Sequence, residues 1–488
     1  GNGTITDIDG NFKFSVSSSK AQLDISYIGY QPQTVTVQPG KNIKITLQED
    51  SKQLDEVVVV GYGTQSKKTL TGAVSMVNMG DVEMNTVPNV SRALAGKAAG
   101  FRVNQVSAQP GGEAKFRIRG EASISAGNEP LFVIDGFPVS SSGNLSSGND
   151  FYESGNIDNV LESLNPDDIE SISVLKDAAS TAIYGARAGH GVVLITTKRG
   201  EKGKVKINVK AGFNWNTPVK VPEYASAYDW ARLANEARVG RYESPLYTDE
   251  EMSIIQHGLD SDLYPNIDWR DLMLKSGAPS YYANISFSGG SDNVRYFVSG
   301  QYTSEDGRYR TSSSENKYNT NSTYERYNYR ANVDMNLTRI TVLKVNVGGW
   351  LVNRNSPSSS SGDIWESFAA FTPLSSPRKW SSGQWASVNG AKTPEYRMTQ
   401  TGYRTIWENK IETSVALEQD LKFITEGLKF SGVFAFDTYN KNTIVRSKEE
   451  ELWEAESYRD EKGQLVLKRL QNASAMSQRK EVSGDKRY

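Results

Sequence analysis

The residues best suited to chemistry in this sequence are few. The chain has no cysteine and only two histidines, His190 and His257, so a zinc site or a Ser-His-Asp triad has little material. Three carboxylates lie close together at Asp167, Asp168 and Glu170, a spacing that acid–base catalysis could use. They stand, however, at the expected start of a helix, where negative charge complements the helix dipole. We therefore expect no enzyme activity, no metal site and no cofactor.

Two further patterns match ligand-binding loops only in part. Asp7 and Asp9 have the spacing that opens a calcium loop, but position 12 is Phe where that loop needs Gly, so we interpret this stretch as a tight turn. The run Gly-Tyr-Gly at 61–63 follows four valines, as in a dinucleotide-binding turn. The third glycine is missing, and a strand-like sequence follows where a helix is needed. A nucleotide site is therefore rejected.

Composition narrows the class of protein. The 488 residues are too many for one ordinary domain. With 55 Lys and Arg against 57 Asp and Glu, the net charge is -2, which provides no basic field for nucleic acid. No apolar run approaches the roughly 20 residues of a transmembrane helix. A membrane role stays open, because β-barrels span bilayers without such runs.

The sequence pattern divides the chain into four parts. Residues 1–49 hold alternating strands and turn residues, and they indicate a small β domain that begins in mid-strand and is therefore truncated. Residues 50–65 form a polar hinge and an apolar strip. Residues 66–200 mix strands with helical spacing, which predicts a compact α+β unit. In residues 201–488 apolar residues recur with a period of two, which predicts strands.

The connections between these last strands alternate in length. We predict short connections at 289–292, 337–338 and 422–427, and long ones at 216–279, 304–322 and 353–410. A transmembrane barrel has this alternation, because its tight turns are periplasmic and its long loops are extracellular. We count about seven to nine strands, at roughly 35 residues each, whereas a plugged barrel has about 22. The chain is therefore expected to be part of a larger polypeptide.

The strip at the hinge, "DEVVVVGYG", lies between two predicted domains and has no obvious partner strand. An ordinary buried strand is one interpretation. A β-prone strip in this position also suits pairing with the sheet edge of another protein, in which main-chain hydrogen bonds provide the affinity. The residues assigned to this role are Asp55, Glu56, Val57, Val58, Val59, Val60, Gly61 and Tyr62.

Several motifs carry a family resemblance. The sequences "LDEVVVVGYGTQSKKTLTGAVS", "RIRG" at 117–120, "PLFVIDGFPV" at 130–139 and "DDIESISVLKDAASTAIYGARAGHGVVLITTKRG" at 167–200 resemble the SusC/RagA-type TonB-dependent outer-membrane transporters of Bacteroidota. Residues 1–49 resemble the carboxypeptidase-regulatory-type domain that precedes the TonB box in this family. The sequence departs from the family at 189–190, where Gly-His replaces the usual Ala-Asn.

The resemblance implies a fold, a location and partners. The fold would be mainly β: an N-terminal β-sandwich, the α+β plug domain at 66–200, and at 201–488 the first part of a transmembrane antiparallel β-barrel of about 22 strands. The strip at 55–62 would be the TonB box of an importer of oligosaccharides or oligopeptides in the bacterial outer membrane. Its partners would be TonB, outer-membrane lipid and a SusD-like lipoprotein lid, in a dimer of transporter–lipoprotein pairs. The alternative is a surface receptor or adhesin that binds glycan or protein without importing it.

Substrate contacts are harder to predict. Aromatic residues of the long loops could stack on sugar rings, and arginines of the plug could face the barrel lumen. The candidates are Trp365, Trp380, Trp385, Tyr396, Tyr403, Trp407, Arg117 and Arg119. The aromatic residues could equally pack within the loops, contact the lid or lie in an interfacial belt, and the arginines could serve the framework of the plug.

Overall fold

The computed structural model describes the chain as two compact units, residues 1–71 and 72–488. Most of the second unit is described, namely 164–221, 223–311 and 316–487. The remaining described residues are 4, 6–7, 11–13, 21–26, 33–38, 40, 43–47, 57–60, 63–66, 74–81, 90, 94, 96–105, 109–112, 114–118, 120, 128–139 and 161.

The first unit contains two antiparallel strand pairs. Strand β1 (Ala21–Ile25) pairs with β2 (Gln33–Val37), and β3 (Val57–Val60) pairs with β4 (Gly63–Ser66). In the second pair, Val57 lies opposite Ser66 and Val60 lies opposite Gly63. The apolar strip therefore has a partner strand within its own hairpin, and the expectation that it has none is wrong. Its strand conformation agrees with the run of four β-branched valines.

The second unit begins with an α+β part, which we call the plug. Its main sheet has the order β5-β10-β11-β8-β9, and a separate pair joins β6 and β7. The elements are β5 (Val74–Asn78), η2 (Met79–Asp81), β6 (Phe101–Gln105), β7 (Ala114–Ile118), β8 (Leu131–Ile134), β9 (Phe137–Val139), η3 (Pro166–Asp168), β10 (Ile169–Leu175), α3 (Ala178–Thr181), η4 (Ala182–Ala188) and β11 (Val192–Thr197).

Local sequence explains much of the plug. Strand β8 is buried along its whole length and pairs in parallel with β11, as a continuous apolar run predicts. The predicted turn at 135–136 is confirmed: Asp135 and Gly136 have φ of 49° and 86°, as the tight turn of a two-residue hairpin requires. The predicted helix start at 166 is wrong. A single 3-10 turn, η3, leads directly into β10, because the following residues complete the middle of the sheet.

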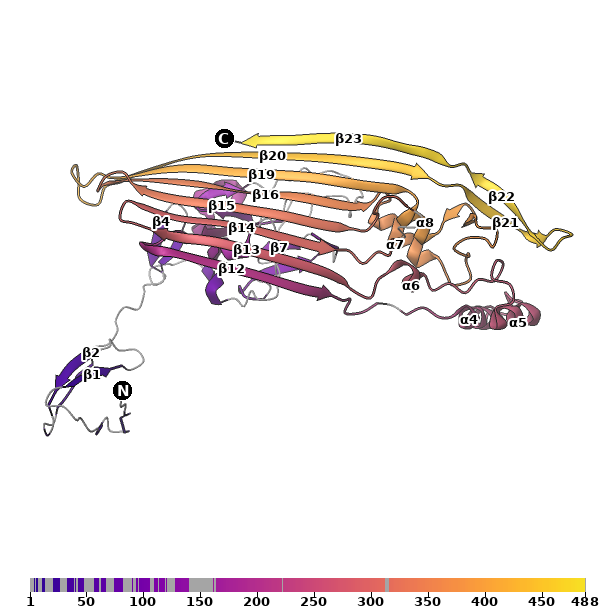
Figure 1. The fold of residues 1–488 in the computed structure, drawn as a ribbon, viewed down its shortest axis with the longest axis horizontal. Coiled ribbons are helices and arrows are strands. Elements are labelled where there is room, and N and C mark those ends of the chain that lie inside the picture. The colour runs from indigo at the N-terminus through magenta and orange to yellow at the C-terminus, as the bar shows by residue number, and fades with distance from the viewer. Residues whose placement is uncertain are drawn as a thin grey trace. The chain divides into compact units, whose positions relative to one another are not determined.

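The rest of the second unit is built on an eight-stranded antiparallel sheet, which we call the wall (Figure 1). Neighbouring strands of the wall follow one another along the chain. The strands that lie within the long connections belong to a separate sheet. The wall strands are β12 (Gly203–Asn216), β13 (Ala278–Gly290), β14 (Val294–Asp306), β15 (Thr323–Asn336), β16 (Thr341–Pro357), β19 (Gly402–Asp420), β20 (Lys429–Glu449) and β23 (Ser474–Arg487). The predicted alternation of short and long connections is confirmed.

The two faces of the wall differ in polarity. Along β15 the buried positions alternate strictly with more exposed ones. Arg330 and its even-numbered neighbours turn toward the plug, whereas Tyr327 and Tyr329 on the opposite face are 48% and 38% exposed. The outward face also carries Phe213, Trp215, Tyr281, Ile285 and Val298. An apolar outer face with aromatic residues near one end is typical of an outer-membrane strand.

The long connections fold together into a body that we call the lobe, formed by the described residues of 217–277, 307–322, 358–401 and 450–473. Its elements are α4 (Ala227–Val239), α5 (Asp249–His257), α6 (Trp269–Met273), α7 (Ser361–Ala370), β17 (Trp385–Val388), β18 (Ala391–Lys392), α8 (Pro394–Thr399), β21 (Leu452–Arg459) and β22 (Leu465–Gln471). Among the described residues, no helix has both the length and the apolar character to cross a membrane.

Candidate functional site between plug and wall

Charged side chains join one side of the plug to the wall. Asp168 of η3 lies 3.7 Å from the Arg330 guanidinium of β15. Arg199, just after β11, lies 2.5 Å from Asp334 on the same wall strand. Asp167 is ion-paired with Lys210 of β12. The carboxylates at 167 and 168 therefore bind the wall, and the interpretation that they serve a helix dipole is wrong.

Asp168 is the most deeply buried of these groups, with 3% of its surface exposed. Burial raises the pKa of its carboxyl to about 6, against the opposing effects of the Arg330 charge and the nearby Ser299 side chain. The Asn165 side chain donates one hydrogen bond to Asp168 at 2.9 Å and another to Asn284 of β13 at 3.0 Å. One amide thus connects the plug carboxylate to a second wall strand.

Neutral contacts fasten the end of β11 to the wall. The Asn332 side chain donates to the Thr197 hydroxyl at 2.9 Å and to the Lys198 carbonyl at 2.8 Å. Gly200 lies against the backbone of Tyr296, where an added Cβ would come within 2.3 Å of the Tyr296 nitrogen. Residues 165–200 are therefore fixed to β12, β13, β14 and β15 by ionic, amide and close backbone contacts.

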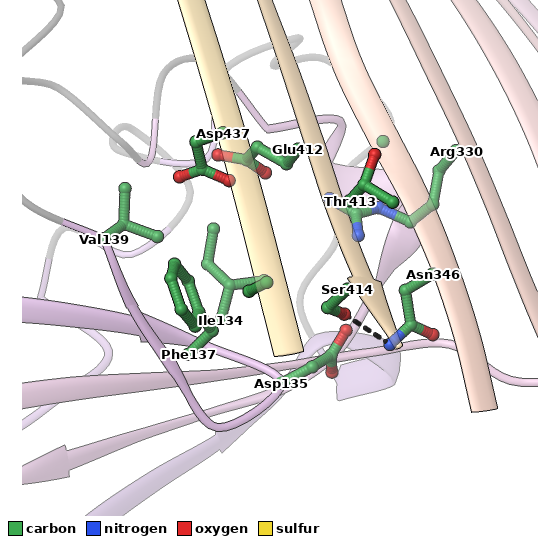
Figure 2. Close-up of a pocket in the computed structure, with 12 residues that line it drawn as sticks. Ile134, Asp135, Phe137, Val139, Arg330, Asn346, Glu412, Thr413, Ser414 and Asp437 are labelled. Atoms are coloured by element: carbon green, nitrogen blue, oxygen red, sulfur yellow. Dashed lines mark hydrogen bonds between the residues drawn. The ribbon is translucent and has the colours of Figure 1, made fainter. Parts of the chain in front are cut away.

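A cavity lies between the β8–β9 hairpin of the plug and the wall (Figure 2). The β8–β9 hairpin contributes Ile134, Phe137 and Val139, while the wall contributes mainly polar side chains. Its remaining lining residues are Asp135, Arg330, Asn346, Gly348, Glu412, Thr413, Ser414, Ala435 and Asp437. The turn of the same hairpin adds Asp135, whose carboxylate accepts from the Thr197 nitrogen and hydroxyl, so this side of the plug presents both apolar and charged groups to the wall.

The interior face of the wall is where sequence interpretation missed functional residues. Arg330, Asn332 and Asp334 contact the plug, and none of them was predicted. A signal was available, because these polar residues occupy alternate positions of a strand whose other face is apolar. Among the residues that the structure describes, no group of three or more His, Asp or Glu side chains could hold a metal ion.

The predicted TonB-binding strip and plug arginines are only partly described. Val57–Val60 form β3, whereas Asp55, Glu56, Gly61, Tyr62 and Arg119 lie outside the described residues. Arg117 lies on β7, donates to the Phe116 carbonyl at 3.0 Å and is 4.0 Å from Glu129. These are contacts within the plug, and they favour the framework role over a lumenal one.

The loop aromatics separate into two groups. Trp380, Trp385 and Tyr396 are buried in the lobe. The Trp380 indole donates to the Trp453 carbonyl at 2.8 Å, and the Trp385 and Tyr396 rings meet edge to face at 5.8 Å. These contacts favour the alternative interpretation, in which the three residues pack within the loops, and Trp385 and Tyr396 form a core with Leu452 of β21.

The other three aromatics keep exposed surface but point in different directions. Trp407 is 51% exposed, and together with Tyr403 it lies on the face of β19 opposite the buried Glu408. The Tyr403 ring stacks on Tyr318 at 5.2 Å. Trp365 of α7 is 36% exposed and packs edge to face on Phe368. Trp365 is therefore the one predicted aromatic that combines an exposed ring with a place in the lobe.

Comparison with known families places this geometry in a class. The family described as the TonB-dependent Receptor Plug Domain matches residues 66–192, and the CarboxypepD_reg-like domain matches residues 1–59. The chain therefore carries the plug of a TonB-dependent receptor behind a carboxypeptidase-regulatory-like domain. The predicted mainly β fold, which combines these domains with part of a barrel, is confirmed.

The chain is also similar to individual TonB-dependent receptors along much of its length. The chain is 39% identical to TonB-dependent receptor P26 of Formosa agariphila over 69% of this chain and 30% of that protein. It is 32% identical to TonB-dependent receptor SusC of Bacteroides thetaiotaomicron over 81% of this chain and 36% of that protein. The open-open structure of the RagAB peptide importer shares the fold, with a TM-score of 0.63 and 24% identity over 80% of this chain and 43% of that one.

The chain spans about a third of the length of the curated relatives it matches. Over that part, its resemblance to the SusC/RagA-type TonB-dependent transporters is confirmed. The predicted outer-membrane location is confirmed with it, and the apolar outer face of the wall agrees with that location.

Proposed function

We propose that the complete protein imports a nutrient across the bacterial outer membrane, driven by TonB. The observation that carries this proposal is a plug attached to the polar inner face of a wall whose outer face is apolar. Such a plug closes a pore, and a closed pore needs energy to open. A membrane receptor that only adheres to its ligand has no use for this arrangement.

The mechanism that we propose uses the asymmetry of the plug attachment. TonB pairs with the strip at 55–62 by strand addition and pulls on the plug through it. Residues 165–200 hold to the wall through the Asp168–Arg330 and Arg199–Asp334 pairs. The β8–β9 hairpin faces the cavity, so this part of the plug has space to move into once the pairing of β8 with β11 is released. In this mechanism the substrate passes along the wall strands that line the cavity.

The cargo that we propose is an oligosaccharide or an oligopeptide. SusC and the RagAB peptide importer are among the proteins that this chain is similar to. As the family resemblance implies, a SusD-like lipoprotein would cover the lobe as a lid. Two transporter–lipoprotein pairs would then form a dimer. Trp365 supplies an exposed aromatic face in the lobe, which could stack on a sugar ring or pack on a peptide side chain.

The experiment is an uptake assay on cells that produce the complete protein and its lipoprotein. Small molecules that co-purify with the complex are identified by mass spectrometry and then supplied in labelled form. Import predicts that the label accumulates inside the outer membrane and that an uncoupler of the proton gradient abolishes this accumulation. A surface adhesin would bind the label equally with and without the uncoupler and would accumulate none.

A further inference from the structure

Among the described residues, the plug contacts the lobe at a tight turn, residues 109–112. The Gly112 nitrogen donates to the Gln109 carbonyl at 2.8 Å. Pro110 occupies the second position and Gly111, with φ of 62°, occupies the third. Proline followed by a residue of positive φ is the signature of a type II turn, in which glycine is strongly preferred at the third position. We call this segment the plug turn.

The plug turn lies directly on the inner face of the wall. The Gly111 nitrogen donates to the Glu305 carboxylate of β14 at 3.1 Å. A Cβ at Gly111 would come within 2.3 Å of the Tyr324 ring, so only glycine permits this approach. Tyr324 cannot easily move away, because it is buried with Trp350 and Val352.

The same turn also contacts the lobe. The Gln109 side chain donates to the Ser361 hydroxyl at 2.6 Å. Ser361 is the first residue of α7, and Ser360 before it caps the helix by accepting from the Asp363 nitrogen. One turn further, Ile364 is fully buried in the main apolar core of the lobe. The contact therefore meets the lobe at the start of a helix that belongs to this core.

The lobe is bonded into a single body, so a force at α7 is transmitted widely. Its apolar core joins α6, α7 and α8 through residues such as Trp269, Phe368 and Met398. Hydrogen bonds link the connections to one another: Trp269 donates to the Thr372 carbonyl, Ser381 to Asp262, and Asn316 to the Thr399 carbonyl. The ion pair between Arg459 and Asp260 adds a further link.

We propose that the plug turn is a latch that couples the position of the plug to the order of the lobe. While the plug is seated, Gln109 holds the start of α7, and Gly111 is clamped between Glu305 and Tyr324. Withdrawal of the plug breaks these contacts together and loosens the lobe around α7. This inference rests on the proposed function, because it takes TonB-driven plug movement as the event that opens the latch.

The first test compares two glycine-to-alanine variants of the complete protein with its lipoprotein. In Gly111→Ala, the methyl group must push the turn off Tyr324, so hydrogen exchange of the amides of residues 361–370 is expected to rise about tenfold or more. Gly96→Ala is the matched control, because Gly96 also has positive φ, 75°, but an added Cβ there meets nothing within 4 Å. Equal exchange of α7 in the two variants would overturn the latch.

The second test locks the latch covalently. The chain has no cysteine, and the close approach of Gly111 to Tyr324 suits a disulfide between Gly111→Cys and Tyr324→Cys. The oxidised double variant is expected to bind ligand but to lose uptake, and reduction should restore uptake. The two single variants control for the substitutions themselves. Undiminished uptake with the disulfide formed would refute the proposal.

The two tests separate this inference from the proposed function. If the protein imports nothing, uptake is already absent in the unmodified protein, whereas the exchange of α7 still reports on the latch. If it imports but Gly111→Ala leaves α7 unchanged, the latch fails and the import proposal stands.

Discussion

At the scale of single residues, Asp168 is the group whose chemistry depends most on its surroundings. Its pKa in the folded protein is about 6, above its ordinary value of 3.8, because burial disfavours the ionised form. A group whose folded pKa is raised contributes stability that is complete below the unfolded pKa and is lost as the pH rises through the folded pKa. The contribution of Asp168 to the stability of the folded protein should therefore fall between about pH 4 and pH 6 as the pH rises.

This leads to a prediction for Asp168→Asn. The asparagine cannot titrate, so the gain in thermal stability that the unmodified protein shows on acidification from pH 7 to pH 5 should shrink. Thermal unfolding of the complete protein in detergent at both pH values measures this gain. Asp167→Asn is the control, because it removes the neighbouring carboxylate and leaves Asp168 in place. An undiminished gain in Asp168→Asn would mean that Asp168 does not titrate in this range.

The aromatic residues of the lobe allow a second prediction. Trp385→Ala removes a buried ring and should cost about 3–5 kcal/mol in stability of the lobe, which limited proteolysis at residues 358–401 would detect. Trp365→Ala removes a partly exposed ring, so it should leave proteolysis unchanged and weaken ligand binding by about 1 kcal/mol, or roughly fivefold. If both variants are cleaved alike, Trp365 is part of the core and has no separate role in binding.

Residue type alone could not separate these two tryptophans. Both lie in the same long connection, and both are aromatic residues in a polar loop sequence. Their difference arises from β17, which carries Trp385 against Leu452 of a connection far along the chain. Contacts between segments so distant in sequence leave no local pattern. Burial of the loop aromatics was therefore beyond prediction from the sequence.

At the scale of elements, the wall strands were the most predictable part of the fold. Successive side chains of a strand point to opposite faces, so apolar and polar residues alternate with a period of two. This alternation is clearest where one face meets lipid and the other meets a polar interior. The helices of the lobe were not predicted from the sequence, although the start of α5 carries a recognisable sequence signal. Thr248 and Glu251 form a capping box, in which each side chain accepts from the backbone of the other residue.

The outward face of β15 gives a third prediction. Ala331 lies in the middle of the apolar outward positions, whereas Thr323 lies on the same face at the end of the strand. Arginine at Ala331 should cost about 2–4 kcal/mol and arginine at Thr323 about 0–1 kcal/mol, because the cost falls from the bilayer centre to its surface. The amount of folded protein in the outer-membrane fraction measures the difference. Equal assembly of the two variants would contradict the predicted membrane position.

At the scale of the whole molecule, the plug is the part of residues 72–488 that contacts both the wall and the lobe. Its later segment is bonded to β12, β13, β14 and β15, its turn at 109–112 contacts the lobe, and its β8–β9 hairpin faces a cavity. The family motifs predicted that such a plug exists, and the matched families agree. They did not predict which wall residues hold it, because those contacts depend on the register between plug and barrel.

The role of the strip at 55–62 in pairing with TonB can be tested by single substitutions. Strand addition depends on main-chain donors, so Val59→Pro, which lacks the backbone N–H, should block pairing with TonB. Val59→Thr keeps both the donor and the β-branched shape, and it should behave as the unmodified protein. The pair of variants separates main-chain pairing from a general effect of altering the strip.

The most direct measurement is uptake and ligand binding, side by side, in the complete protein with residues Asp55–Tyr62 deleted. The account predicts that uptake falls to the level of cells without the transporter, while binding of the ligand to the cell surface is unchanged. Uptake that continues at the normal rate would contradict TonB-driven import through this strip and would leave β3 with a structural role only.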